Sequence, residues 1–450
     1  MAPLHRRSGG APRNENPPAG RQRCPRRQPR RQRRGGRDHL RLYLRLRQRR
    51  NARRQAFAME RAGRAQPRRA EPELRPRAAA GIPRALEGLL REGRQMNSTS
   101  PRRNRLTTPI MALAFVLLAT LSATAENEAA FALTDDEKAP ELTEEAAKAI
   151  DNGLKWLIAT QNPNGSWTSR EGKFDIAGTS LALTAFMVEG HFPGFGPYGD
   201  ALSRGKDFLL KRMEDSPSGS MGVKMYEIGL YTLAMSELWG MTKDPEDNAK
   251  IQEALDRAVQ IILRSQNPLG GWRYAPRPDA GQDTSVTAMV FVCLASAREA
   301  GILVPNETIE RVTNYLRDQA FDEERGGFGY QGRGYTIACT AGGVYAAQLA
   351  GNRDTEWVEA ALSSLENDPK MFSRKENGYF YYSHYYAMQA MVQAGDDRYA
   401  KWYPKIRDAL IELQKPDGSW VEKEEDYPHK TPMAIIILGT PNRYIPVYQR

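Results

Sequence analysis

The feature that most constrains the fold of this 450-residue chain is a loop that recurs along it. Each copy places a large apolar residue directly after glycine or another small residue. The copies end at Trp167, Met221, Trp272, Phe328, Tyr379 and Trp420. A further glycine follows each loop by roughly 20 residues, at Gly190, Gly240, Gly301, Gly351, Gly395 and Gly439. Two markers with one period predict six units of about fifty residues.

Each unit is predicted to contain two helices of different character. The helix before the loop has charges on one face and apolar residues at three- and four-residue spacing, as at Ile150, Leu154 and Leu157. These helices are expected over 143–161, 200–214, 248–266, 306–319, 354–366 and 398–414. The helix after the loop is nearly uncharged, and these are expected over 176–189, 225–239, 284–300, 336–350, 382–394 and 432–438.

The alternation of the two helix types predicts how they pack. A helix that is apolar all round must be buried, whereas an amphipathic helix covers a core with one face. Six apolar helices inside six amphipathic ones give an all-α fold, an α/α toroid of six helical hairpins over residues 126–450. An open solenoid would leave its apolar helices half exposed to water.

The net charge of +11 comes from the beginning of the chain. Residues 1–95 carry 28 Arg against 7 acidic residues, while residues 126–450 carry 34 basic and 47 acidic residues. The leader 1–95 is too polar to fold, so we expect disorder. We interpret it as translation of GC-rich DNA from a start set too far upstream, although an Arg-rich tail could bind nucleic acid. The acidic remainder predicts no nucleic-acid partner.

Residues 96–125 have the organisation of a secretory signal peptide. Basic residues follow Met96, the apolar run Ile110–Leu121 comes next, and Ser122–Ala125 ends on an Ala-x-Ala cleavage pattern. Residues 126–450 are therefore predicted to be exported to a periplasmic or extracellular location, or to be membrane-anchored if the signal is not cleaved. No later stretch is apolar enough to predict a transmembrane segment.

The first loop and the helix before it carry a family resemblance. An aromatic residue and Leu at 156–157, then Gln161, then Gly165-Ser166-Trp167 resemble the QW motif of the prenyltransferase/squalene-oxidase repeat family. Gln266 to Trp272 and Gln414 to Trp420 repeat its core. The resemblance covers residues 140–450 and implies the α6/α6 toroid that terpenoid cyclases share with protein prenyltransferase β-subunits.

The motif residues are expected to be structural. A Gln amide can bridge backbone groups freed at a helix end, and a Trp can fill the wedge between neighbouring outer helices. This structural role is predicted for Gln161, Trp167, Gln266, Trp272, Gln414 and Trp420.

The acid chemistry of terpenoid cyclases is not carried over. Their Asp-x-Asp-Asp motif, whose middle acid protonates an alkene, corresponds here to residues 280–283, where only Asp283 matches and Gln282 stands at the donor position. An amide cannot act as this general acid. The zinc site of protein prenyltransferases would need Asp283, Cys339 and His384 to converge, and their spacing differs from the family pattern. No metal and no cofactor are expected.

The first turns of the inner helices are predicted to surround one mouth of the toroid. A titratable group at an apolar helix start is costly unless it is used or paired, which makes Asp283 and His384 the catalytic candidates. The candidates for substrate binding are Asp175, Glu227, Gln282, Tyr335, Tyr382 and Tyr385. Their aromatic rings could hold an isoprenoid, stack on sugars, or fill the barrel.

Two classes of function fit these features. The first is an exported module that binds an isoprenoid, a glycan or a protein. The second is an enzyme, either terpene cyclase- or mutase-like or a polysaccharide lyase or hydrolase with acids at the inner helix starts. An open pocket joining Asp283, His384 and Glu227 favours the enzyme, and a barrel filled by tyrosines favours the module.

Overall fold

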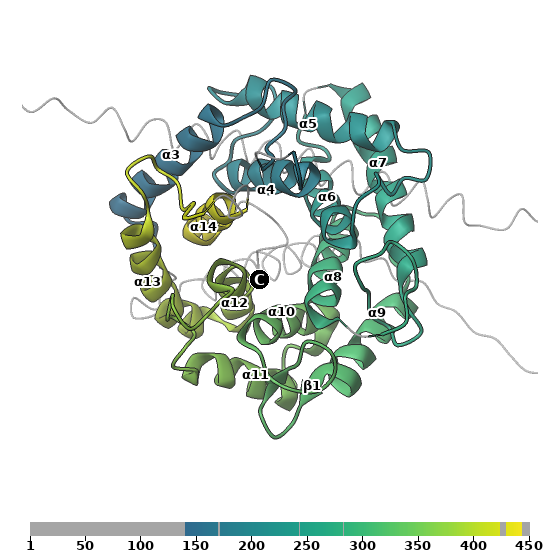
Figure 1. Cartoon of the computed structure of the whole chain (residues 1–450), viewed down its shortest axis with the longest axis vertical. Helices are drawn as coiled ribbons and strands as arrows, with labels where there is room; N and C mark the ends of the chain where they lie inside the picture. Colours follow the sequence, from purple (N-terminus) through teal and green to yellow (C-terminus); the bar gives the residue numbers. More distant parts are fainter. Residues whose placement is uncertain (1–139, 170–171, 243, 282, 424–428, 443–450) are drawn as a thin grey trace, which may run out of the picture.

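The computed structural model describes residues 140–169, 172–242, 244–281, 283–423 and 429–442. The predicted leader, the predicted signal peptide and Gln282 lie outside these ranges. Within them, twelve α-helices form two concentric rings, and the chain passes alternately from the outer to the inner one (Figure 1). No helix in the described ranges has both the length and the apolar character needed to cross a membrane. The predicted all-α toroid of six hairpins is confirmed.

The inner ring consists of the helices that follow the loops. They are α4 (Asp175–Val188), α6 (Met225–Leu238), α8 (Thr284–Glu299), α10 (Ile337–Ala347), α12 (Phe380–Ala394) and α14 (Lys430–Leu438). These helices are apolar on all sides, and α6, for example, buries every residue except Tyr226. A position inside a second ring of helices buries such a sequence.

The outer ring consists of the amphipathic helices. They are α3 (Glu144–Ala159), α5 (Gly199–Glu214), α7 (Pro245–Ser265), α9 (Asn306–Asn314), α11 (Glu356–Asn367) and α13 (Asp396–Leu413). Helix α3 begins at the N-cap Thr143, whose hydroxyl accepts the Ala146 N–H, and buries Ile150, Leu154 and Leu157. Short segments complete the fold: η1 (Tyr315–Ala320), η2 (Gln348–Asn352), η4 (Thr440–Asn442) and the hairpin β1 (Phe321–Asp322) with β2 (Gly327–Phe328).

At three junctions the recurring loop ties one outer helix to the next. The amide Nε2 of Gln161 donates to Gly165 O in its own loop at 3.0 Å and to Ala201 O of α5 at 2.8 Å. The buried indole of Trp167 donates to Leu157 O at 2.7 Å. Equivalent bonds run from Gln266 to Gly270 and Thr308, from Trp272 to Ile262, and from Trp420 to Leu410. The amide therefore joins a carbonyl of its own loop to a carbonyl of the neighbouring outer helix.

The last unit closes the ring on the first. Helix α14 packs against α4, and α13 packs against α3. Across this junction the Gln414 amide donates to Ala149 O of α3 at 2.7 Å. Gly418 has a φ of +89°, and a Cβ there would lie 2.6 Å from Asn152 O, so only glycine allows this approach.

Candidate functional site

A cavity of 970 Å³ opens at the amino ends of the inner helices. Each inner helix contributes to its wall from the first two turns or the cap. The apolar lining includes Ala177, Leu181, Leu230, Ala338, Cys339 and Met433, and the aromatic lining consists of Phe174, Tyr226, Tyr274, Tyr330, Tyr379 and Tyr382. The ionisable side chains of aspartate, glutamate, histidine and lysine in the lining are few: Lys224, Glu227, Glu376 and His429.

Four aromatic side chains form an exposed rim. The exposed fractions are 54% for Phe174, 38% for Tyr274, 38% for Tyr330 and 71% for Tyr379. Only two other large apolar side chains are this exposed in the described part of the chain. Large apolar groups gathered at the opening of a concave site are typical of a ligand-binding surface. We refer to these four residues as the aromatic rim.

Phe174 of the rim also has a strained backbone. It precedes α4 with a φ of 59°, in the left-handed region that a bulky side chain adopts only at a cost. Met221 is the other non-glycine residue with a positive φ in the described ranges. Strain of this kind persists where the surrounding structure imposes it, and it concentrates at functional sites.

Hydroxyl groups meet at Ser285 in the cavity wall. Tyr226 Oη donates to Ser285 Oγ at 2.9 Å, and Tyr382 Oη donates to Ser285 O at 3.2 Å. Ser285 Oγ in turn donates to Asp283 Oδ1 at 2.7 Å. Burial raises the pKa of Tyr226, so this phenol stays protonated and can donate. The chain of bonds links the cavity to a fully buried carboxylate.

Asp283 lies behind the cavity wall and is not part of its lining. It is the N-cap of α8, where Oδ1 also accepts the Val286 N–H at 3.0 Å. Its other oxygen, Oδ2, has no hydrogen-bond partner, although the residue is 0% exposed. The hydroxyls of Tyr330 and Tyr274 are 2.9 Å apart, and this bond is the main reason that the pKa of Tyr330 is raised, followed by burial and the Asp283 charge.

Glu227 is the candidate carboxylate that lines the cavity itself. Its side chain is buried, and burial raises its pKa; the Lys224 N–H opposes this shift, and the Asp175 charge adds to it. Asp175 is the first residue of α4, and its Oδ2 lies 3.6 Å from Arg212 Nη1. The structure therefore puts Glu227 in the cavity and leaves Asp175 outside its lining.

His384 lies away from the cavity, on the side of α12 that faces α13. It is fully buried against Phe372, Phe380 and Trp402, with ring centroids 4.9, 4.6 and 5.9 Å away. Its Nε2 is 3.1 Å from Met371 O. Burial lowers its pKa to about 3, which keeps the ring neutral. The structure does not bring together the predicted catalytic pair of Asp283 and His384.

The three tyrosines that were predicted to bind substrate lie in three different places. Tyr382 lines the cavity. Tyr385 is buried, with its ring 4.8 Å from that of Tyr386. Tyr335 donates to Asp368 Oδ2 at 2.7 Å in a separate 620 Å³ pocket. Within the described ranges, no group of three His, Cys, Asp or Glu side chains is placed to hold a metal ion.

Several lining residues were not predicted from the sequence, although the repeat contains a signal for two of them. Tyr274 and Tyr330 each stand two residues after the large apolar residue of their loop, Trp272 and Phe328. Aligning the six loops by that residue places both tyrosines at the mouth. Phe174 lies at the end of a longer loop, so this alignment does not predict its position.

Comparison with known proteins finds the fold but not a family. No protein-family profile and no curated protein matches the chain. Similar solved structures include inactive variants of the alpha-1,6-mannanase GH76A of Salegentibacter sp. HEL1_6. The complex with alpha-1,6-mannotriose is 12% identical, covers 66% of this chain and 99% of the other, and gives a TM-score of 0.51. The complex with alpha-1,6-mannotetrose is 12% identical, covers 67% and 100%, and gives 0.50.

Type II terpene cyclase MstE from Scytonema is 15% identical over 68% of this chain and 100% of its own, with a TM-score of 0.44. At these identities the mannanase similarity establishes an α/α toroid and nothing about activity. The class that the fold and the site define is a single α/α toroid with an open cavity lined mainly by apolar and aromatic side chains.

Proposed function

We propose that the protein is a binding module for an elongated, mainly apolar ligand with a neutral polar end, such as an isoprenoid alcohol. The observation that carries the proposal is the 970 Å³ cavity, which is lined by aliphatic and aromatic side chains and opens at the aromatic rim. This volume lies at the upper end of about 300–1,000 Å³ that small-molecule sites span. An apolar chain gains most from such a wall because every buried methylene leaves water.

The charges at the mouth favour a neutral polar end over an anionic one. Helix amino ends attract anions, and six of them converge here. The protein's own carboxylates already occupy two of these ends, with Asp283 capping α8 and Glu227 in the first turn of α6. A diphosphate would meet the Glu227 carboxylate in the lining, whereas a hydroxyl group can donate to the hydroxyl oxygen of Ser285, Tyr226 or Tyr382.

An enzyme that acts on the same ligand is the second candidate, and the unpartnered Asp283 Oδ2 is the observation that favours it. The binding module ranks first because Asp283 already caps a helix and stands behind Ser285, outside the cavity lining. A polysaccharide enzyme ranks lower because the exposed surface of the lining is mainly apolar.

Blocking the cavity tests the proposal. Leu181 lies in the wall and is 1% exposed, so Leu181→Trp fills the space beside α4. We expect the unaltered chain to bind geranylgeraniol with a Kd in the micromolar range, measured by quenching of tyrosine and tryptophan fluorescence. Leu181→Trp should abolish binding, and Tyr379→Ala at the exposed rim should weaken it without lowering the melting temperature.

The matched control is Leu303→Trp, which adds the same ring to an exposed leucine outside the cavity. Its affinity should equal that of the unaltered chain. Absence of binding to the unaltered chain, or equal binding by Leu181→Trp and Leu303→Trp, contradicts the proposal.

Export of residues 126–450 is part of the proposed biology. It is supported by the sequence pattern at 96–125. N-terminal sequencing of protein from native cells should give a first residue near Glu126. A first residue at Met1 would contradict the interpretation of the leader.

A further inference from the structure

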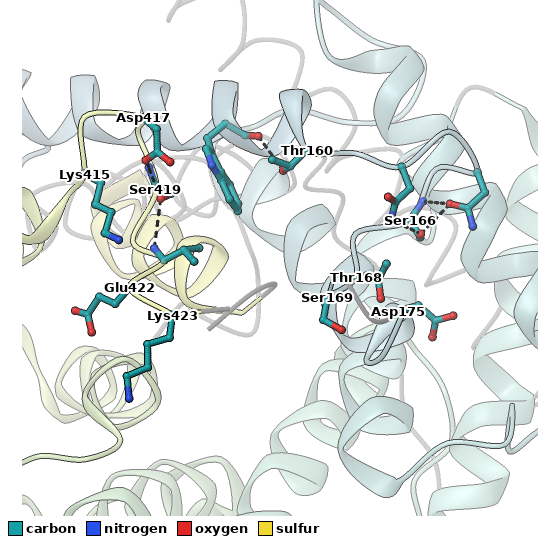
Figure 2. Close-up of a pocket in the computed structure, with 15 residues that line it drawn as sticks. Thr160, Ser166, Thr168, Ser169, Asp175, Lys415, Asp417, Ser419, Glu422 and Lys423 are labelled. Carbon is teal, nitrogen blue, oxygen red and sulfur yellow. Dashed lines mark hydrogen bonds between the residues drawn. The ribbon is translucent and has the colours of Figure 1, made fainter. Parts of the chain in front are cut away.

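A second pocket, of 890 Å³, lies where the ring closes. One wall comes from the loop after α3 and the other from the loop after α13. Helix α3 contributes Trp156 and its C-cap Thr160. Figure 2 shows the two loops on opposite sides of the pocket, with Asp417 and Ser419 facing Ser166 and Thr168 across it. No residue lines both this pocket and the central cavity. We refer to it as the seam pocket because it lies where the ring closes.

The chemistry of the seam pocket is the reverse of that of the central cavity. Its lining holds one aromatic ring, the partly exposed indole of Trp156, which packs against the core on its other side. Most of the remaining side chains are hydroxyls, amides, carboxylates or ammonium groups. A sugar ring has an apolar C–H face for an indole and a rim of hydroxyls that both donate and accept, so this combination fits a saccharide.

Hydrogen bonds within each loop shape the walls of the seam pocket before any ligand arrives. Asn164 Oδ1 accepts from the N–H and hydroxyl of Ser166 at 3.1 and 2.8 Å. Across the pocket, Asp417 Oδ1 accepts from the same two groups of Ser419 at 2.9 and 2.8 Å. Each loop is anchored underneath by a buried Trp of the repeat motif. A preformed wall reduces the ordering entropy that binding costs.

The balance of charge distinguishes a neutral glycan from a polyanion. Lys415 and Lys423 stand among the carboxylates of Asp175, Asp417 and Glu422. Mixed charges of nearly equal number do not attract nucleic acid or an acidic polysaccharide, which need a basic surface. They do supply charge-assisted hydrogen bonds to hydroxyl groups.

The aromatic platform is specific to this junction. Trp156 stands five residues before Gln161 of its motif, and the residues at the same place before Gln266 and Gln414 are Ile261 and Ala409. The fold therefore accepts small or aliphatic residues at this position and does not require an indole.

We propose that the seam pocket is a binding site for a neutral oligosaccharide, with Trp156 as the stacking platform and the two loops as hydrogen-bonding walls. The site is independent of the central cavity and of the ligand proposed there.

The test measures binding of the whole chain to cellohexaose, xylohexaose, mannohexaose, maltohexaose and chitohexaose by isothermal titration calorimetry. We expect at least one to bind with a Kd between micromolar and millimolar. Trp156→Ala should weaken that binding at least tenfold, and Trp156→Phe should retain part of it. Lys415→Ala should weaken it severalfold, whereas its matched control Lys401→Ala, at an exposed site on α13, should not.

The central-cavity variant Leu181→Trp should bind the oligosaccharide normally, which separates this proposal from the previous one. The proposal is overturned if no member of the panel binds, if both Trp156→Ala and Lys415→Ala bind undiminished, or if Leu181→Trp alone abolishes binding. It is also overturned if a peptide of residues 126–139 binds in a Trp156-dependent way and no saccharide does, since the occupant is then a segment of the chain itself. Thermal melts of each variant establish that a loss of binding is not a loss of fold.

Discussion

Glu189 offers the sharpest test of the electrostatics of the barrel. It follows α4 at the carboxyl end of the inner ring, away from the cavity mouth, and Asn442 Nδ2 donates to both of its oxygens at 3.0 Å. Burial raises its pKa from the ordinary value of 4.5 to about 8, and the Asn442 bonds oppose this only in part. The carboxyl group is therefore largely protonated in the folded protein at pH 7.

The sign of the effect on stability follows from linkage. A carboxyl whose pKa is raised in the folded state contributes its full stability below pH 4.5, and that contribution is lost as the pH rises toward 8. Each pH unit between those values changes the free energy of unfolding by about 1.4 kcal/mol. Glu189→Gln removes the titration, so the difference in unfolding free energy between variant and wild type should shift by at most about 3 kcal/mol in favour of the variant between pH 5 and pH 7.

Comparison with the variant is necessary because His384 titrates in the opposite sense. Burial lowers its pKa from 6.5 to about 3, so its contribution to stability is lost as the pH falls below 6.5. The two effects cancel in part in the wild type but not in the difference. Urea unfolding at pH 5, 6, 7 and 8 measures that difference, with the exposed Glu214→Gln as the control. The reasoning is refuted if Glu189→Gln and Glu214→Gln follow the wild type in parallel across this range.

Two further predictions concern single side chains. Asp283→Ala removes the cap of α8 and should lower the unfolding free energy by about 1 kcal/mol. Asp283→Asn can still cap the helix and should cost less in the same urea titration. A larger loss for Asp283→Asn than for Asp283→Ala contradicts the capping role. Trp272→Ala empties a site that is 0% exposed and should cost about 3–5 kcal/mol in urea unfolding. Trp156→Ala, at a partly exposed site, should cost less, and an equal or greater cost contradicts this account of the repeat.

The fold could be predicted because two independent regularities coincide. The period of the loops set the number of units, and the contrast between apolar and amphipathic helices set the layer of each one. The inner helix expected over 225–239 is observed at Met225–Leu238. The helix expected over 336–350 ends earlier as α10 and continues as η2, where Gly351 has a φ of 93°. That ending depends on backbone conformation, which helical periodicity does not report.

The candidate site was predicted less completely because it depends on the rotation of each helix about its axis. Successive residues turn by about 100° in an α-helix, so residues two apart lie on nearly opposite faces. Tyr382 faces the cavity, and His384, two residues later, consequently faces α13. The sequence placed both near the start of α12 but could not tell which one faced inward. The aromatic rim was missed for a related reason, since loop conformation decides where Phe174 lies.

The repeat also indicates where function can reside in such a ring. A closed toroid needs equivalent junctions, and Gln161, Gln266 and Gln414 make the same bonds in three of them. Positions that make the same bonds at several junctions are constrained by the fold, so positions where the units differ are free to carry a ligand. Phe174 and Trp156 are of the second kind, and each lines a pocket. Variants at these two residues should therefore alter binding more than stability, and variants at the motif glutamines should do the reverse.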